Sequence, residues 1–78
     1  MILNSERSPK DSLYYIGAFL LKILKNEKNE LEINELLRKA KEQNINISLF
    51  YYALDWLYLI SLIEVKGERI YLKWNLKN

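Results

Sequence analysis

Apolar residues recur at helical spacing in the first third of the chain. Ser8 and Pro9 have the form of a helix start, since Ser8 can accept a hydrogen bond from a free amide and Pro9 suits the first helical position. We expect a helix from Pro9 to about Lys25, before the polar stretch 26–30. Its main apolar stripe comprises Leu13, Ile16, Gly17, Leu20 and Leu24. The other sides are apolar too, which predicts a helix that is covered on most sides.

Two further helices are predicted in the middle of the chain. A very short strand at residues 31–33 precedes the second helix, which Asn34 would cap and which ends near residue 42. Ser48 would cap a third helix that runs to about Ile60. The residues expected to point inward from the third helix are Phe50, Ala53, Leu54, Leu57 and Ile60.

The period changes from 3.6 to 2 after residue 62. Two alternating runs flank Gly67-Glu68, which predicts a β-hairpin. The residues expected to face the helices are Ile63, Val65, Ile70 and Leu72. Three helices followed by a C-terminal hairpin predict an α+β fold of the winged-helix type, with a plain α+β domain as the alternative. We expect one domain over residues 1–78, with residues 1–8 as a flexible N-terminal segment.

Composition excludes most catalytic chemistry. The chain has 78 residues, a net charge of +2, no cysteine and no histidine, so zinc sites, cysteine nucleophiles and serine–histidine pairs are excluded. Its two glycines are too far apart for a phosphate-binding loop. Glu30, Glu32 and Glu35 stand among lysines, as on a solvated surface. We therefore expect no catalytic, cofactor or metal site.

Size and the N-terminus indicate where and how the chain works. A chain this short has a thin core, and without disulfides or metals a protein partner is the remaining common source of stability. Residues 1–11 lack an apolar run of signal-peptide length, which predicts a cytoplasmic protein. The longest apolar run, residues 13–21, is about half of what a membrane span needs.

Direct DNA binding, as a transcriptional regulator, is one interpretation of a winged helix, because its third helix often enters the major groove. Here the predicted third helix contains no Lys or Arg, and its only charge is Asp55. Basic residues lie instead on the hairpin and on the second helix, interleaved with acids: Lys66, Arg69 and Lys73, and Arg38, Lys39 and Lys41. This pattern predicts weak, non-specific DNA contact at most.

A protein interface is the favoured interpretation. Tyr51, Asp55 and Tyr58 fall on the side of the third helix opposite its inward stripe, and the first helix adds Tyr14 and Tyr15. Tyrosine is enriched at interfaces, where it offers a rigid apolar ring with one polar tip. The alternative is that these tyrosines cover the edge of a thin core. Self-association stays open as well.

Two segments resemble a known family. Residues 9–18, PKDSLYYIGA, are similar to a PExSLLxIGA opening, and residues 47–59, ISLFYYALDWLYL, are similar to an ISxxxFxxALDxLYxLGxI centre. Both patterns are found in the small middle component of bacterial ABC-three component systems. The resemblance covers about residues 7–73. Ser61 stands where the family tends to have glycine, and Phe50 lies slightly earlier than the usual aromatic residue.

The resemblance implies a winged-helix-like accessory subunit that catalyses nothing itself. Such a subunit is encoded beside an SMC- or Rad50-like ATPase and an effector, in systems linked to defence against phage and plasmids, and it bridges or regulates the ATPase. The matched positions include Gly17, which would permit close helix packing, and Asp55, which would cap a helix or pair with a basic group. Both roles are equally compatible with a purely structural purpose.

Overall fold

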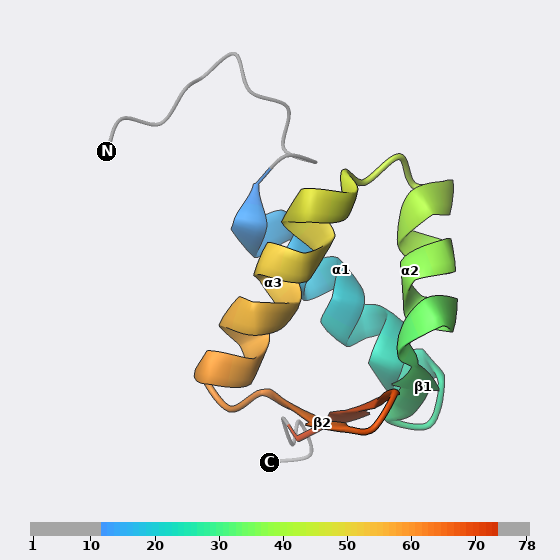
Figure 1. Ribbon diagram of the computed structural model, residues 1–78, viewed down its shortest axis with the longest axis vertical. Helices are drawn as coiled ribbons and strands as arrows, with labels where there is room; N and C mark the ends of the chain where they lie inside the picture. Colours follow the sequence, from blue (N-terminus) through green and yellow to red (C-terminus); the bar gives the residue numbers. More distant parts are fainter. Residues whose placement is uncertain (1–11, 74–78) are drawn as a thin grey trace.

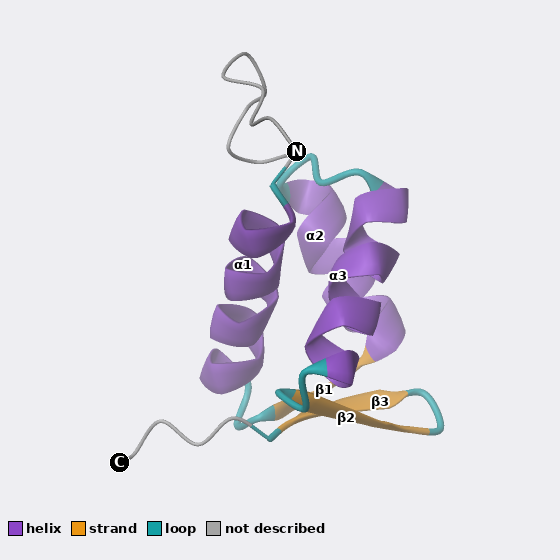
Figure 2. Ribbon diagram, turned by 90° about the vertical axis from the view of Figure 1, so that its left-hand side faces the viewer, coloured by secondary structure: helices purple, strands orange, loops and turns teal. Residues whose placement is uncertain are grey.

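The computed structural model describes residues 12–73 and has the winged-helix order of elements (Figure 1). Within these residues, three helices and three strands follow in the order α1 (Leu13–Asn26), β1 (Glu30–Glu32), α2 (Ile33–Glu42), α3 (Ile47–Leu59), β2 (Ile63–Lys66) and β3 (Arg69–Leu72). The three helices pack as a bundle, and the sheet lies across one end of them (Figure 2). The predicted α+β winged-helix fold is confirmed. No helix in the described part of the chain has the length and apolar character needed to cross a membrane.

The sheet is antiparallel and has the order β1-β3-β2. Lys66 pairs with Arg69, so Gly67 and Glu68 form the two-residue loop predicted for the hairpin. Gly67 has φ +60°, a left-handed conformation that glycine adopts without a steric penalty. The short strand β1 joins the other edge of β3, which ties the segment between α1 and α2 to the hairpin.

The helix starts differ from those predicted. Ser12 caps α1, because its Oγ accepts a hydrogen bond from the Tyr15 amide at 3.3 Å. The predicted start at Ser8 and Pro9 lies outside the described residues. Asn46, not Ser48, caps α3: its Oδ1 accepts from the amides of Ser48 and Leu49 at 2.7 and 3.2 Å. An Asn two residues earlier satisfies two free amides, and this favours it over the predicted serine.

The predicted cap of α2 is wrong too, since Asn34 lies inside the helix. The N-cap position belongs to Glu32, whose side chain makes no capping bond. The Ile33 amide instead donates to the carbonyl of Glu68 at 2.8 Å. The hairpin loop therefore satisfies one of the free amides at the start of α2, which a reading of local sequence does not reveal.

The core lies between the three helices and the sheet. The largest fully buried side chains are Phe50, Ile16, Leu20, Leu24, Leu36, Leu57, Ile63 and Ile70. Two predicted core residues are exposed. Ile60 is 44% exposed because it is the C-cap of α3, beyond the last helical turn. Val65 is also 44% exposed, because it lies near the hairpin loop on the edge strand β2, although it pairs with the buried Ile70 on the central strand.

The end of α3 is a tight left-handed turn at Ser61. The Ser61 amide donates to the Tyr58 carbonyl at 3.0 Å, and the Leu62 amide donates to the Leu57 carbonyl at 2.9 Å. These two bonds define a Schellman motif, in which the residue after the C-cap adopts positive φ. Ser61 has φ +66° in that position. The motif turns the chain so that Leu62 returns toward the core, against which it packs.

Candidate protein-interaction surface

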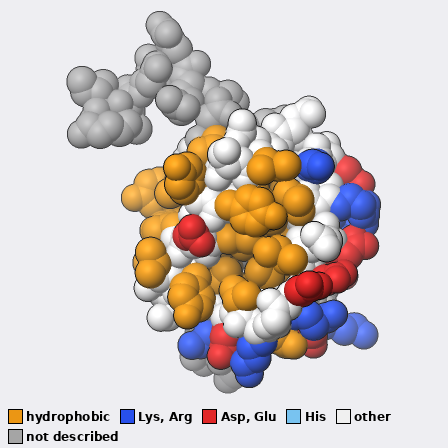
Figure 3. Space-filling view, in the orientation of Figure 1, with side chains coloured by type: hydrophobic (Ala, Val, Ile, Leu, Met, Phe, Trp, Pro, Cys, Tyr) orange, Lys and Arg blue, Asp and Glu red, His pale blue; other side chains and the backbone are white. Residues whose placement is uncertain are grey.

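Helix α3 has more apolar surface than the core uses. Its inner side is buried through residues such as Phe50 and Leu57. Its solvent side carries the residues that we call the α3 outer surface: Tyr51, Tyr52, Asp55, Tyr58 and Leu59. Figure 3 shows apolar and aromatic side chains gathered over this side of the molecule, with charged side chains toward its margins.

The exposure of the α3 outer surface is high for such large side chains. Leu59 is 76% exposed, Tyr52 63%, Tyr58 55% and Tyr51 43%. Single exposed apolar residues are ordinary, but a contiguous group on one helix is typical of a binding surface. Of the predicted interface residues, Tyr51, Asp55 and Tyr58 therefore lie together on the solvent side of α3.

Asp55 lies in the middle of this aromatic group and is exposed. Within residues 12–73 no basic side chain forms an ion pair with it, and it makes no capping hydrogen bond. The predicted structural role of Asp55, as a cap or an internal ion-pair partner, is thus not found in the described part of the chain. Its carboxylate is available to a basic group of another molecule.

The α3 outer surface continues onto the hairpin. A shallow, polar groove of about 350 Å³ lies between the end of α3 and β2. Tyr58 and Leu59 form its helical side, and Val65 and Lys73 contribute from the hairpin. Val65, which is exposed on β2, thus lies across this polar groove from the end of α3.

The other two predicted interface tyrosines, Tyr14 and Tyr15, lie on α1 and are not part of the α3 outer surface. Tyr14 packs against Trp56 in an edge-to-face arrangement, with ring centroids 5.2 Å apart and ring planes at 86°. Trp56 projects about 140° around α3 from Tyr51, at about 100° per residue. Tyr14 therefore lies on the flank of α3 that faces α1. Tyr15 follows Tyr14 on α1 and is 41% exposed, about 100° further round that helix.

Gly17 has the packing role that the sequence suggested. A Cβ at this position would lie 2.8 Å from Cζ3 of Trp56 and 3.6 Å from Cδ2 of Leu57. The first distance is shorter than van der Waals contact permits, so the absence of a side chain lets α1 and α3 approach closely.

The basic residues considered for DNA contact are partly engaged in the fold. On the hairpin, Arg69 Nε lies 3.0 Å from Glu30 Oε1, and Lys66 Nζ lies 5.9 Å from the centre of the Tyr71 ring. Lys73 is exposed at the end of the described chain. The Arg69–Glu30 ion pair reduces the positive charge that the wing presents to a phosphate backbone.

On α2, the same pairing occurs around Arg38. It forms ion pairs with Glu35 and Glu42, each at 2.8 Å. The hydrogen bond to Glu35, followed by the nearby carboxylate charges, raises the pKa of the Arg38 guanidinium above its usual value. Lys39 Nζ lies 3.7 Å from Glu27 Oε2, and Lys41 is exposed. Helix α2 therefore presents a mixed-charge surface.

Three residues that the sequence did not single out contribute to these surfaces: Leu59, Tyr52 and Trp56. Leu59 has the highest exposure on the α3 outer surface, and Tyr52 follows it. The stripe Tyr52, Asp55, Leu59 at i, i+3 and i+7 was a usable signal for both. The pairing of Trp56 with Gly17 and Tyr14 depends on how α1 and α3 meet, for which no local signal exists.

The described part of the chain, residues 12–73, contains no group of three or more carboxylates placed to hold a metal ion. Comparison with protein families gives a match over residues 3–73, nearly the whole sequence, to ABC-three component (ABC-3C) system Middle Component 6. The chain belongs to this family. No curated protein and no solved structure matches it. The predicted relationship to the middle components is confirmed, and the winged helix described above is the fold of this Middle Component 6 protein.

Proposed function

We propose that this middle component is a non-catalytic accessory subunit that binds an SMC- or Rad50-like ATPase through the α3 outer surface. The complex would act in the cytoplasm in defence against phage and plasmids, together with an effector, and residues 1–78 would work as one domain. Membership of the ABC-three component family supports a role among protein partners. The exposed aromatic group on α3 is the observation that carries the choice of surface.

The chemistry of the α3 outer surface suits a protein partner. Rigid aromatic side chains lose little conformational entropy on binding, and central aromatic anchors contribute strongly to interfaces. Tyr51 and Tyr58 would be such anchors. Asp55 between them would pair with a Lys or Arg of the ATPase, and such a charge-assisted contact adds specificity. Polar contacts in the adjoining groove, which Val65 also lines, would enlarge the interface.

Co-purification with the ATPase component tests the proposal. The double variant Tyr51→Ala, Tyr58→Ala is expected to lose the ATPase, since central aromatic anchors commonly contribute about 2 kcal/mol or more, roughly thirtyfold in affinity. Lys41→Glu on the exposed side of α2 is the control and should retain it. Circular dichroism must remain that of the folded chain. A folded double variant that still co-purifies with the ATPase would contradict the proposal.

A further inference from the structure

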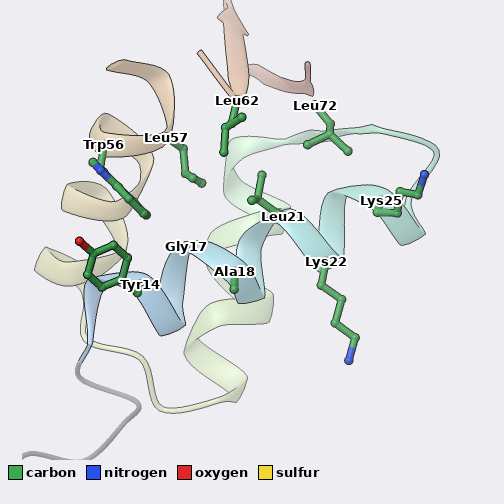
Figure 4. Close-up of a pocket in the computed structure, with 10 residues that line it drawn as sticks. All are labelled: Tyr14, Gly17, Ala18, Leu21, Lys22, Lys25, Trp56, Leu57, Leu62 and Leu72. Carbon is green, nitrogen blue, oxygen red and sulfur yellow. The ribbon is translucent and has the colours of Figure 1, made fainter. Parts of the chain in front are cut away.

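A second apolar surface lies on the flank of the molecule formed by α1 and α3; it shares no residue with the α3 outer surface, although its residue Trp56 lies one turn from Tyr52. It is a groove of about 360 Å³ lined by residues from both helices and from the start and end of the hairpin. Figure 4 shows leucines in its middle: Leu21, Leu57, Leu62 and Leu72. Apart from the ends of Lys22, Lys25, Tyr14 and Trp56, its lining offers no polar side-chain group.

The groove has two chemically different ends. At one end Tyr14 and Trp56 form an aromatic wall, with their rings edge to face (Figure 4). At the other end Lys22 and Lys25 extend from α1, with their ammonium groups pointing away from the helix. Because they are three residues apart, both lysines border the groove along the same part of α1.

The two lysines have no acidic partner within residues 12–73. Lys28, Lys41, Lys66 and Lys73 form no ion pair there either, whereas Arg38, Lys39 and Arg69 each form one. Positive charge beside an apolar groove is thus left uncompensated by the fold. This charge, together with the apolar groove, is complementary to a partner that carries an acidic group next to apolar side chains.

The size of the groove limits what it can hold. An engineered cavity of about 150 Å³ holds one benzene ring, so this groove has room for roughly two apolar side chains. It is lined by α1, α3 and the two ends of the hairpin. Two apolar side chains one turn apart on a partner helix match this shape.

We propose that the groove binds an amphipathic helix of the effector component. Two neighbouring apolar side chains of that helix would enter the groove, and an acidic residue beside them would meet Lys22 and Lys25. The inference rests on the proposed function, because the α3 outer surface is assigned to the ATPase and a subunit that joins two proteins needs a second, separate surface. The middle component thereby contacts both partners at once.

Two variants test the groove without touching the core. Ala18 lines the groove but is exposed, so Ala18→Glu adds bulk and negative charge there while keeping a good helix-forming residue. Lys22→Glu combined with Lys25→Glu reverses the charge at one end. The matched controls are Ala18→Ser, which leaves the groove open, and Lys41→Glu, which changes the charge on the exposed side of α2.

Binding of the full chain to the purified effector and to the purified ATPase is measured separately for each variant. We expect both groove variants to bind the effector at least about tenfold more weakly and the ATPase unchanged, with the controls unaffected. Wild-type affinity for the effector should also fall with rising salt. Folded groove variants that keep both partners, or that lose the ATPase instead, would overturn the inference. The Tyr51→Ala, Tyr58→Ala variant reports on the ATPase surface alone, so the two proposals fail independently.

Two other occupants give different results in the same experiments. If a second copy of the chain occupied the groove, light scattering would show a dimer for the wild type and a monomer for Ala18→Glu. If residues 74–78 of the chain itself occupied the groove, deleting them and introducing Ala18→Glu would each destabilise the fold by the same amount. Combining the two changes would then cost no more than either one alone. Either result would overturn the assignment to an effector helix.

Discussion

The ring of Trp56 lies directly against Gly17, where a Cβ would come within 2.8 Å of its Cζ3 atom. This contact fixes how closely α1 and α3 approach, and it also forms one side of the groove between them. A single glycine therefore links the packing of the fold to the geometry of a proposed binding surface.

Gly17→Ala is expected to destabilise the fold. The overlap with the Trp56 ring costs typically about 1–3 kcal/mol, and the better helix propensity of alanine returns up to about 1 kcal/mol. The net loss of about 1 kcal/mol is measured by urea unfolding. In a Trp56→Leu background the clashing ring is absent, so the same change should become neutral or stabilising. A double-mutant cycle with no coupling between the two positions would contradict this account.

Ser61→Gly is expected to stabilise the chain by about 1 kcal/mol, because Ser61 has φ +66° and a non-glycine residue pays a steric penalty in that region. The position follows the C-cap of α3 in the Schellman motif, where glycine is preferred. Ser61→Ala retains the penalty and serves as the control. A higher melting temperature for glycine but not alanine is the expected result; equal shifts would count against it.

Val65 and Ile70 lie opposite each other in the hairpin, yet they should respond differently to truncation. Ile70 is fully buried on the central strand, so Ile70→Ala is expected to cost about 2–4 kcal/mol. Val65 is 44% exposed on the edge strand, and Val65→Ala should cost less than about 1 kcal/mol. Thermal unfolding of both variants checks the difference, and similar losses would mean that the hairpin packs on the helices along its whole length.

The two tyrosines of the α3 outer surface should also differ in stability. The Tyr51 ring packs edge to face on the buried Phe50, with centroids 5.0 Å apart, whereas Tyr58 is 55% exposed. Tyr51→Ala is therefore expected to cost about 1 kcal/mol and Tyr58→Ala less than about 0.5 kcal/mol. Chemical denaturation separates these values. A Tyr58→Ala variant that unfolds would identify this tyrosine as part of the core.

The helices and strands could be predicted from the sequence because their buried residues recur with different periods. The 3.6-residue stripes of Ile16, Leu20 and Leu24 in α1 and the alternation around Ile70 in β3 each reflect one buried face. Predicted boundaries were less accurate. Asn46 and Ser48 are both good caps, and the choice between them depends on where the chain turns in three dimensions.

The sequence predicted the α3 outer surface but not the groove between α1 and α3, for a related reason. Tyr51, Asp55 and Tyr58 lie on one helix, so their spacing alone places them on a common side. The groove requires α1, α3 and the hairpin to meet, and the pairing of Tyr14 with Trp56 joins residues far apart in the sequence. Long-range packing of this kind leaves no periodic signal, so the sequence could not show that Tyr14 packs against Trp56 at the groove.

The last prediction concerns DNA, the ligand of many winged helices. Helix α3 contains no Lys or Arg, and the wing residue Arg69 already pairs with Glu30 at 3.0 Å. Few phosphates can then be neutralised at once, so the isolated chain is expected to bind labelled duplex only weakly at physiological salt and without sequence preference. Lys66→Glu combined with Lys73→Glu should remove the residual binding, since these two wing lysines form no ion pair within residues 12–73. Sub-micromolar affinity with a clear sequence preference would instead favour a transcriptional regulator over an accessory subunit, because base-edge readout by α3 or the wing would then be needed to explain it.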